Sequence, residues 1–404
     1  MKAVTFDAGL LRYLFTLSAG KINKKLHYGG LSCVRLENIS EPKLPGEDWV
    51  KIRTTYGGIC GSDINLVFLH DTPTLSPFVS KKFVIGHENV GVIVEKGKAV
   101  KGFEVGDRVV ADSILSCESR GLNKCPSCLK GDTNLCSNFS RGRLEAGTMM
   151  GTCGDTGGSW GEYYTAHSSQ LFKVPDSLSD EQAVLTDPLC SAIHPVLGSL
   201  PKDNEKVLII GMGIIGLLAV AVLRAMGSRA YISVVARHMF QGELAKKYGA
   251  DHVIYSNDMS MEEEVAKVTG GRVYKPMLGE KYIIGGYDKV FDCAGSQRSI
   301  RDSVRFIRSG GTLVLVGLAA NISMDWTLVW FKEINLKGTY CYGSDDFNGI
   351  RERTFRIGLD MLSSGKIDTS PLITHVFSLE DYRQAIETAA GKGKYKSIKV
   401  LLMP

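Results

Sequence analysis

A glycine-rich turn between two apolar segments constrains the fold more than any other feature of the sequence. Residues 211–216 read Gly-Met-Gly-Ile-Ile-Gly, after the strand-like residues 207–210 and before the helix-like residues 215–226. In a βαβ unit the first glycine permits a tight turn, the second admits a pyrophosphate, and the third lets helix and strand pack closely. The pattern predicts a dinucleotide site, and a glycine-rich packing contact is the alternative. The residues expected to bind are Gly211, Gly213, Ile214, Ile215 and Gly216.

The end of the next predicted strand bears on which dinucleotide binds. An acidic residue about twenty positions after the turn usually holds the ribose 2′-hydroxyl, but residues 234–238 read Val-Val-Ala-Arg-His. Ala236 removes a charge that would repel a 2′-phosphate, and Arg237 can pair with that phosphate. His238 is a second potential cation. We therefore expect NADP(H) to be preferred over NAD(H); a solvated arginine beside NAD is the alternative.

The same apolar segment has to be weighed as a membrane span. Residues 207–223 carry no charge and approach the minimum length for a spanning helix. Three glycines interrupt the segment and it begins as a strand, so a buried strand running into a buried helix is favoured. Asp7 and Arg12 also interrupt any secretion signal. We expect a cytoplasmic protein with no membrane partner, whose ten cysteines are metal ligands or buried groups.

The pattern of predicted strands and helices changes along the chain. A length of 404 residues favours two domains. Short β-type runs alternate with glycine-rich turns in the first third, which predicts a mostly β domain. From about residue 206, strand-like and helical segments alternate in the manner of a doubly wound parallel sheet. The expected α/β organisation is a β-rich domain at 1–188, a dinucleotide-binding domain at 189–342, and a return to the first domain at 343–404.

Two groups of residues have the composition of zinc sites. Cys60 and His87 are suitable zinc ligands, and a catalytic zinc needs three protein ligands and an open position. Asp187 is the best candidate for the third ligand, with Glu88 favoured as a supporting carboxylate over a transient ligand. Taken singly, Cys60 and His87 would more often be core residues.

The second group consists of four cysteines in a lobe at about residues 113–140. Four thiolates this close together suit a closed, structural zinc. A redox CxxC is the competing interpretation, but no strand-to-helix context surrounds it. The four are Cys117, Cys125, Cys128 and Cys136.

The charge balance excludes one class of partner. The net charge of +5 arises from 48 basic and 43 acidic residues, and the one short basic run lies at 392–396. A nucleic-acid-binding surface needs clustered Lys and Arg, so we expect no nucleic-acid partner.

Taken together, these motifs resemble the zinc-containing medium-chain dehydrogenases, in the branch that holds polyol, sugar, threonine and secondary-alcohol dehydrogenases. The resemblance covers nearly the whole chain. It rests on Gly-Ile-Cys-Gly-Ser-Asp at 58–63, Gly-His-Glu at 86–88, Gly-Asp-Arg-Val at 106–109, the four-cysteine lobe, Asp-Pro-Leu at 187–189 and the glycine-rich turn. It implies a GroES-like catalytic domain, a Rossmann domain and a homo-oligomer, either a dimer or a tetramer.

The resemblance also implies an activity and roles for particular residues. A hydride would pass between an alcohol and NADP, with zinc acting as a Lewis acid on the substrate oxygen. Zinc would bind Cys60, His87 and Asp187. Asp63 would orient the imidazole, Ser62 would begin the proton relay, and Lys399 would reach the pyrophosphate. The alternatives are a zinc-free quinone or enoyl reductase and a non-enzymatic NADPH-binding protein on the same fold.

Three features depart from the family pattern. Asn65 stands where many relatives have a relay histidine, and the gap between Cys117 and Cys125 is longer than usual. Residues 9–28 form an insertion in the first hairpin, apolar at 11–17. The insertion is expected to cover the active site, to form an oligomer interface, or to be a plain surface hairpin. Cys153, near a glycine-rich turn, has no role that the sequence explains.

Overall fold

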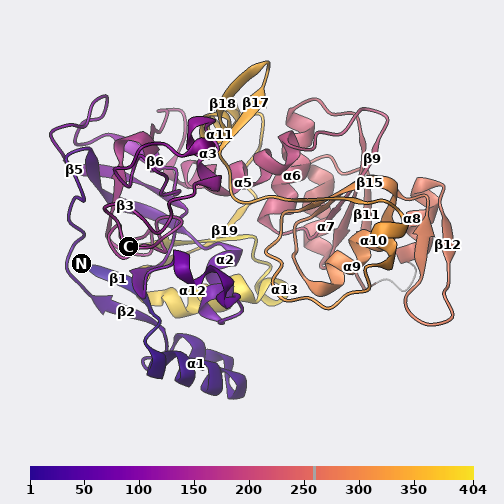
Figure 1. Ribbon diagram of the computed structural model, residues 1–404, viewed down its shortest axis with the longest axis horizontal. Coiled ribbons are helices and arrows are strands. Elements are labelled where there is room, and N and C mark those ends of the chain that lie inside the picture. Colours follow the sequence, from indigo (N-terminus) through magenta and orange to yellow (C-terminus); the bar gives the residue numbers. More distant parts are fainter. Residues whose placement is uncertain (258–260) are drawn as a thin grey trace. The chain divides into compact units, whose positions relative to one another are not determined.

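The computed structural model describes residues 1–257 and 261–404, which divide into two compact units (Figure 1). The first unit comprises Met1–Cys190, Tyr342–Ser344 and Asn348–Pro404. The second comprises Ser191–Cys341 and Asp345–Phe347. The indigo N-terminal strands and the yellow C-terminal elements therefore belong to one unit.

The main sheet of the first unit has seven strands and joins segments that are far apart in the sequence. Its order is β19-β20-β3-β5-β6-β8, and β7 pairs with β3. Val50 and Ile52, two positions apart on β3, are fully buried and pack against Ile93, because alternate residues of a strand face the same side. The strands are β3 (Trp49–Gly58), β5 (Asn89–Lys96), β6 (Arg108–Ala111), β7 (Tyr163–His167), β8 (Leu171–Lys173), β19 (Ile373–Ser378) and β20 (Lys399–Met403).

A smaller sheet of this unit carries the insertion. Its order is β2-β1-β4, from β1 (Lys2–Asp7), β2 (Val34–Asn38) and β4 (Lys82–Val84). β1 and β2 pair antiparallel, as a hairpin requires. The connection between them is not a plain hairpin, because it forms helix α1 (Leu10–Ile22) and the 3₁₀ helix η1 (Lys24–Tyr28).

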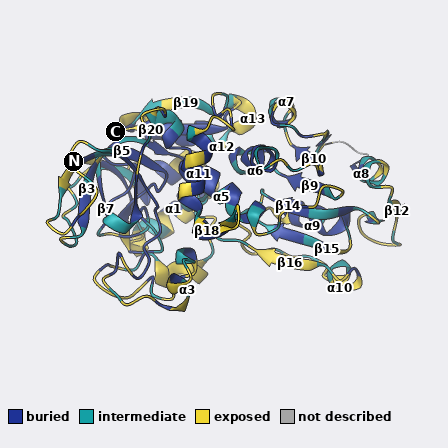
Figure 2. Ribbon diagram, turned by 90° about the horizontal axis from the view of Figure 1, so that it is seen from above, coloured by how far each residue is buried: buried dark blue, intermediate teal, exposed yellow. Residues whose placement is uncertain are grey.

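The second unit is built on a six-stranded parallel sheet in the order β11-β10-β9-β14-β15-β16. Counted along the chain, this is the 3-2-1-4-5-6 order of a dinucleotide-binding sheet, which confirms the predicted doubly wound fold. Helices flank the strands, and Figure 2 shows α6 largely buried. The strands are β9 (Lys206–Ile210), β10 (Tyr231–Ala236), β11 (His252–Tyr255), β14 (Tyr287–Asp292), β15 (Ile307–Leu315) and β16 (Asn335–Gly338). The helices are α6 (Ile214–Ala225), α7 (Met239–Lys247), α8 (Met261–Thr269), α9 (Gln297–Phe306) and α10 (Thr327–Phe331).

The apolar residues 207–223 contribute to β9 and α6, as the sequence favoured. Among the described residues, no helix is long and apolar enough to cross a membrane. The remaining helices are α2 (Gly61–Val67), η2 (Pro73–Phe78), α3 (Pro126–Leu129), η3 (Thr133–Leu135), η4 (Ser168–Gln170), α4 (Asp180–Ala183), α5 (Thr186–Leu197), α11 (Thr354–Ser363), η5 (Leu379–Asp381), α12 (Tyr382–Ala390) and α13 (Lys392–Tyr395). The remaining strands form two pairs, β12 (Arg272–Tyr274) with β13 (Tyr282–Ile284) and β17 (Ser344–Phe347) with β18 (Ile350–Arg353).

Candidate metal and cofactor sites

Three potential metal ligands meet beside β3 in the first unit. Cys60 follows this strand and precedes α2, whereas His87 and Glu88 lie between β4 and β5. One ligand atom from each residue lies within 4.8 Å of those from the other two. His87 and Glu88 are buried. A thiolate, an imidazole and a carboxylate are the donor types that zinc binds, so the donor set fits this metal.

Asp63, in the first turn of α2, connects two of these residues. Its Oδ2 accepts a 2.8 Å hydrogen bond from the backbone N–H of Cys60, and its Oδ1 lies 3.5 Å from Nδ1 of His87. Burial alone would lower the pKa of His87, but the charge of Asp63 and the hydrogen bonds to Asp63 and Cys60 together raise the pKa well above its usual value. A carboxylate on Nδ1 leaves Nε2 as the ligand atom, which fits the orienting role expected for Asp63.

Glu88 is held by a buried lysine, Lys399, for which the family resemblance implies a contact with the cofactor pyrophosphate. The ammonium nitrogen of Lys399 lies 2.6 Å from both carboxylate oxygens of Glu88 and 3.1 Å from the carbonyl oxygen of Ile59. These three acceptors use the three N–H donors of the ammonium group. The expected contact with a pyrophosphate is therefore replaced, in this structure, by an internal ion pair.

The backbone at Gly58 leaves room for this carboxylate. A β-carbon at position 58 would lie 1.9 Å from Oε2 of Glu88, so any other residue would displace the side chain. Pairing of Leu401 with Gly58 brings β20, and with it Lys399, to the same place. Close packing against Glu88 thus explains why the motif has a glycine at position 58.

Asp187 lies outside the group formed by Cys60, His87 and Glu88. Its Oδ2 accepts a 2.6 Å hydrogen bond from the hydroxyl of Tyr342 and lies 3.5 Å from Oγ of Ser113. Burial raises its pKa to about 6. The carboxylate that groups with the ligand atoms of Cys60 and His87 is thus that of Glu88, whereas Asp187 is hydrogen-bonded to Tyr342. Tyr342 and Ser113 belong to no recognisable motif, so neither residue could be predicted from the sequence.

Ser62 keeps its hydroxyl available. The side chain is half-buried in α2, and no hydrogen bond joins it to any described residue. Asn65, one turn later, is also half-buried. The arrangement permits Ser62 to contact a substrate oxygen, but Asn65 supplies no base to continue a relay.

The four cysteines of the lobe converge around α3. All four Sγ atoms lie within 4.8 Å of one another, and none of the ten cysteines, all of which lie in the described residues, forms a disulfide. Sγ of Cys117 lies 3.5 Å from Sγ of Cys136. A disulfide would need about 2.05 Å, whereas four thiolates about 2.3 Å from a tetrahedral zinc lie about 3.8 Å apart. The long gap before Cys125 is therefore no obstacle to Cys117 joining the cluster.

Backbone and amide donors surround these sulfurs. Asn138 donates from its backbone N–H to Cys136 at 3.3 Å and from Nδ2 to Cys117 at 3.2 Å. The hydrogen bond from the Cys128 thiol lowers the pKa of Cys136. Such donors stabilise negative charge on sulfur, as a metal-bound thiolate requires.

The glycine-rich turn of the second unit has the geometry of a phosphate-binding turn. Gly211 has φ = +97°, and a β-carbon there would lie 2.8 Å from Ala294. A β-carbon on Gly216 would lie 2.1 Å from the carbonyl oxygen of Gly211. Helix α6 begins at Ile214, and its N-cap Gly213 offers no side chain. The first backbone N–H groups of α6, including that of Ile215, therefore have no intrahelical acceptor and can bind a pyrophosphate.

The end of β10 lies beside this turn, since the carbonyl of Val235 accepts a 3.1 Å hydrogen bond from Gly211. Ala236 ends the strand and is buried, and Arg237 is exposed. No acidic group lies within salt-bridge distance of Arg237 in the described parts of the chain. His238 is the N-cap of α7 and stacks on Phe240, with ring centroids 5.8 Å apart.

Comparisons with known proteins agree with this architecture. Residues 46–176 match the family model of the alcohol dehydrogenase GroES-like domain, and residues 215–355 match that of the zinc-binding dehydrogenases. L-idonate 5-dehydrogenase of Vitis vinifera is 32% identical over 378 residues, which cover 92% of each chain. This chain belongs to the zinc-type medium-chain dehydrogenases.

Other members of this family show the same breadth of similarity. L-threonine 3-dehydrogenase of Alteromonas mediterranea is 31% identical, over 91% of this chain and 95% of its own. A Sinorhizobium meliloti 1021 structure with bound NADP superposes with a TM-score of 0.70 at 26% identity, over 92% of this chain and 96% of the other.

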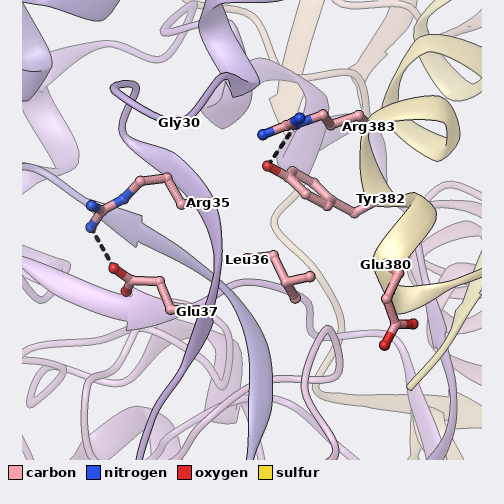
Figure 3. Close-up of a pocket in the computed structure, with 7 residues that line it drawn as sticks. All are labelled: Gly30, Arg35, Leu36, Glu37, Glu380, Tyr382 and Arg383. Carbon is pink, nitrogen blue, oxygen red and sulfur yellow. Dashed lines mark hydrogen bonds and ion pairs between the residues drawn. The ribbon is translucent and has the colours of Figure 1, made fainter.

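Two further features of this medium-chain dehydrogenase lie apart from the metal clusters. Cys153 is buried in a small core with Trp49 and Leu115, and burial raises its pKa to about 11, as expected for an unreactive thiol. A surface pocket of about 490 Å³ opens beside β2 (Figure 3). Its charged side chains balance, and they contact one another or their neighbours. These side chains are Arg35, Glu37, Glu380 and Arg383.

Proposed function

We propose that the protein is a zinc-dependent alcohol dehydrogenase that transfers a hydride between a secondary alcohol, polyol or sugar and NADP. The observation that carries the proposal is the convergence of the partly buried Cys60 with the buried His87 and Glu88 in a member of this family. Relatives named for L-idonate and L-threonine support a small hydroxylated substrate. A second copy of the chain is the expected partner and stays a prediction.

We assign the catalytic zinc to Cys60, His87 and Glu88, and the structural zinc to the four cysteines of the lobe. Lys399 balances one of the two negative charges that Cys60 and Glu88 bring to the site. Each oxygen of Glu88 keeps a further lone pair for the metal. Asp187, engaged by Tyr342, lies outside this ligand set.

When bound, zinc supplies a Lewis acid for the substrate oxygen, and NADP supplies the hydride acceptor. Ser62 receives the hydroxyl proton of the substrate, and the proton then passes to water or ribose because Asn65 is not a base. Asp63 keeps the ring of His87 in place. In the second unit, the N-terminus of α6 holds the pyrophosphate and Arg237 holds the 2′-phosphate.

Metal analysis combined with assays tests the proposal. Protein purified with zinc supplied should contain about two zinc ions per chain and oxidise members of an alcohol, polyol and sugar panel with NADP. Cys125→Ser should lose about one zinc and stability, because it opens the structural site. The absence of bound zinc in the folded wild type would contradict the assignment.

Two matched variants identify the third ligand of the catalytic zinc. Glu88→Gln should lose about one zinc and most activity, whereas Asp187→Asn should keep both ions. Because Glu88→Gln leaves the Lys399 ammonium buried without its partner, the double variant Glu88→Gln with Lys399→Met serves as the folding control. Loss of zinc from Asp187→Asn alone would restore Asp187 as the ligand.

A further inference from the structure

Helix α1 presents its apolar side to solvent, which is the reverse of an ordinary surface helix. Residues spaced three and four apart share a face of a helix. The face that includes Leu10, Leu14 and Leu17 is exposed, and so are Leu11 and Ile22 at its edge, with 84% and 89% of their surface accessible. Phe15 is partly exposed on the same side.

The orientation of α1 is fixed by polar contacts on its other side. Thr16 is buried, accepts a 3.0 Å hydrogen bond from the backbone N–H of Cys33, and donates to the carbonyl of Arg12 at 2.8 Å. Gly20 is also buried, and Tyr13 packs on the core of this unit. The helix therefore cannot turn its leucines inward without breaking these contacts.

The charged side chains within the segment that carries this face all have one sign. Residues 8–36 contain five basic and no acidic side chains. Arg12 pairs with Asp7 and Lys25 pairs with Glu387. Lys21 and Lys24 are exposed, and no carboxylate lies within 4 Å of either one in the described parts of the chain. An apolar patch flanked by unpaired cations complements a surface that is apolar inside and anionic outside.

We propose that α1 is a peripheral membrane anchor that docks on an anionic lipid surface. Its exposed leucines, Phe15 and Ile22 enter the acyl boundary, and Lys21 and Lys24 meet the headgroups. In Figure 1, α1 protrudes beyond β2 from the body of the first unit, as a helix lying in a membrane interface must. The chain lies on the membrane without spanning it, which revises the sequence-based expectation of no membrane partner.

A second copy of the chain fits this surface less well. A two-fold interface would place the same patch against itself. Because residues 8–36 hold no carboxylate, the patch offers no group to pair with Lys21 and Lys24 of the other copy. The proposal does not depend on the enzymatic activity, because the sites described above lie on other elements.

Co-flotation of the full chain with vesicles tests the proposal. The wild type should float with vesicles that contain phosphatidylcholine and phosphatidylserine, should stay behind with phosphatidylcholine alone, and should detach as salt is added. Lys21→Gln with Lys24→Gln should weaken binding to the anionic vesicles about thirtyfold, at about fivefold for each lysine. Leu11→Glu with Leu14→Glu should abolish binding.

A control variant and two contrary outcomes complete this test. Leu278→Glu alters a side chain that is 93% exposed on the second unit, and it should leave both vesicle binding and activity unchanged. Equal binding of the wild type and the α1 variants would overturn the proposal. The proposal would also be overturned if the wild type bound neither kind of vesicle and its self-association, measured by analytical ultracentrifugation, were lost when Leu11 and Leu14 are replaced.

Discussion

Ser62 and Lys399 illustrate how differently single residues of one motif-rich chain can be interpreted from sequence. Ser62 lies two positions after Cys60, so the chain itself places it beside the metal site. Lys399 lies 311 residues after Glu88 in the chain, and the two side chains meet because β20 pairs with β3. Local spacing therefore suffices to place Ser62 next to Cys60, but it could not reveal the partner of Lys399.

Removal of the Ser62 hydroxyl tests its role in proton transfer. Ser62→Ala should lower kcat about 10²- to 10⁴-fold, the usual contribution of a positioned proton-transfer group. The zinc content should stay unchanged, because serine is not a ligand. Ser62→Thr keeps a hydroxyl and should retain most of the turnover. Steady-state kinetics with NADP would decide, and an unchanged kcat in Ser62→Ala would remove Ser62 from the mechanism.

At the scale of elements, α9 concentrates buried charge behind the dinucleotide-binding sheet. Asp302 accepts a 2.7 Å hydrogen bond from Arg305, and Lys332 donates to three carbonyls at the C-terminal end of the helix. Burial raises the pKa of Asp302 from 3.8 to about 6, although Arg305 opposes the shift. The folded state therefore holds the Asp302 proton more tightly than the unfolded state does.

This shift predicts a defined dependence of stability on pH. Between the unfolded pKa of 3.8 and the folded pKa of about 6, the folded state binds more protons, so Asp302 makes the free energy of unfolding fall as pH rises. Above about 6 the effect is constant. Asp302→Asn should lack this fall, which amounts to about 3 kcal/mol. Urea unfolding of both proteins from about pH 4 to pH 7 gives the difference, and parallel curves would contradict the prediction.

At the scale of the whole molecule, one unit carries the two candidate groups of zinc ligands and the other carries the glycine-rich turn proposed to bind the dinucleotide. The proposed contact with the 2′-phosphate therefore belongs to the second unit. Arg237→Ala should raise the KM for NADP about tenfold to a hundredfold, the range for a lost hydrogen bond to a charged group, while the KM for NAD stays the same. Arg229→Ala, which alters an exposed arginine on the same unit, is the matched control. Equal KM values for NADP in wild type and Arg237→Ala would refute the 2′-phosphate contact.

The sequence predicted the architecture well because its signals are periodic and local. The glycine-rich turn, the strands around it and the α/β class are confirmed by the structure and by the family match. The helix at residues 10–22 was not foreseen, because its apolar residues face solvent and so do not mark a core-facing stripe. The hydrogen bond from Tyr342 to Asp187 joins residues 155 positions apart, and no sequence motif predicts it.

The ion pair between Glu88 and Lys399 also constrains when, during synthesis of the chain, the first unit can finish folding. A ribosome adding about 5–20 residues per second needs about 15–60 s to travel from one codon to the other. Once β8 has been made, the nascent first unit still holds the Glu88 carboxylate without Lys399, and its main sheet still lacks β19 and β20. Folding of this unit must therefore finish after the second unit has been translated.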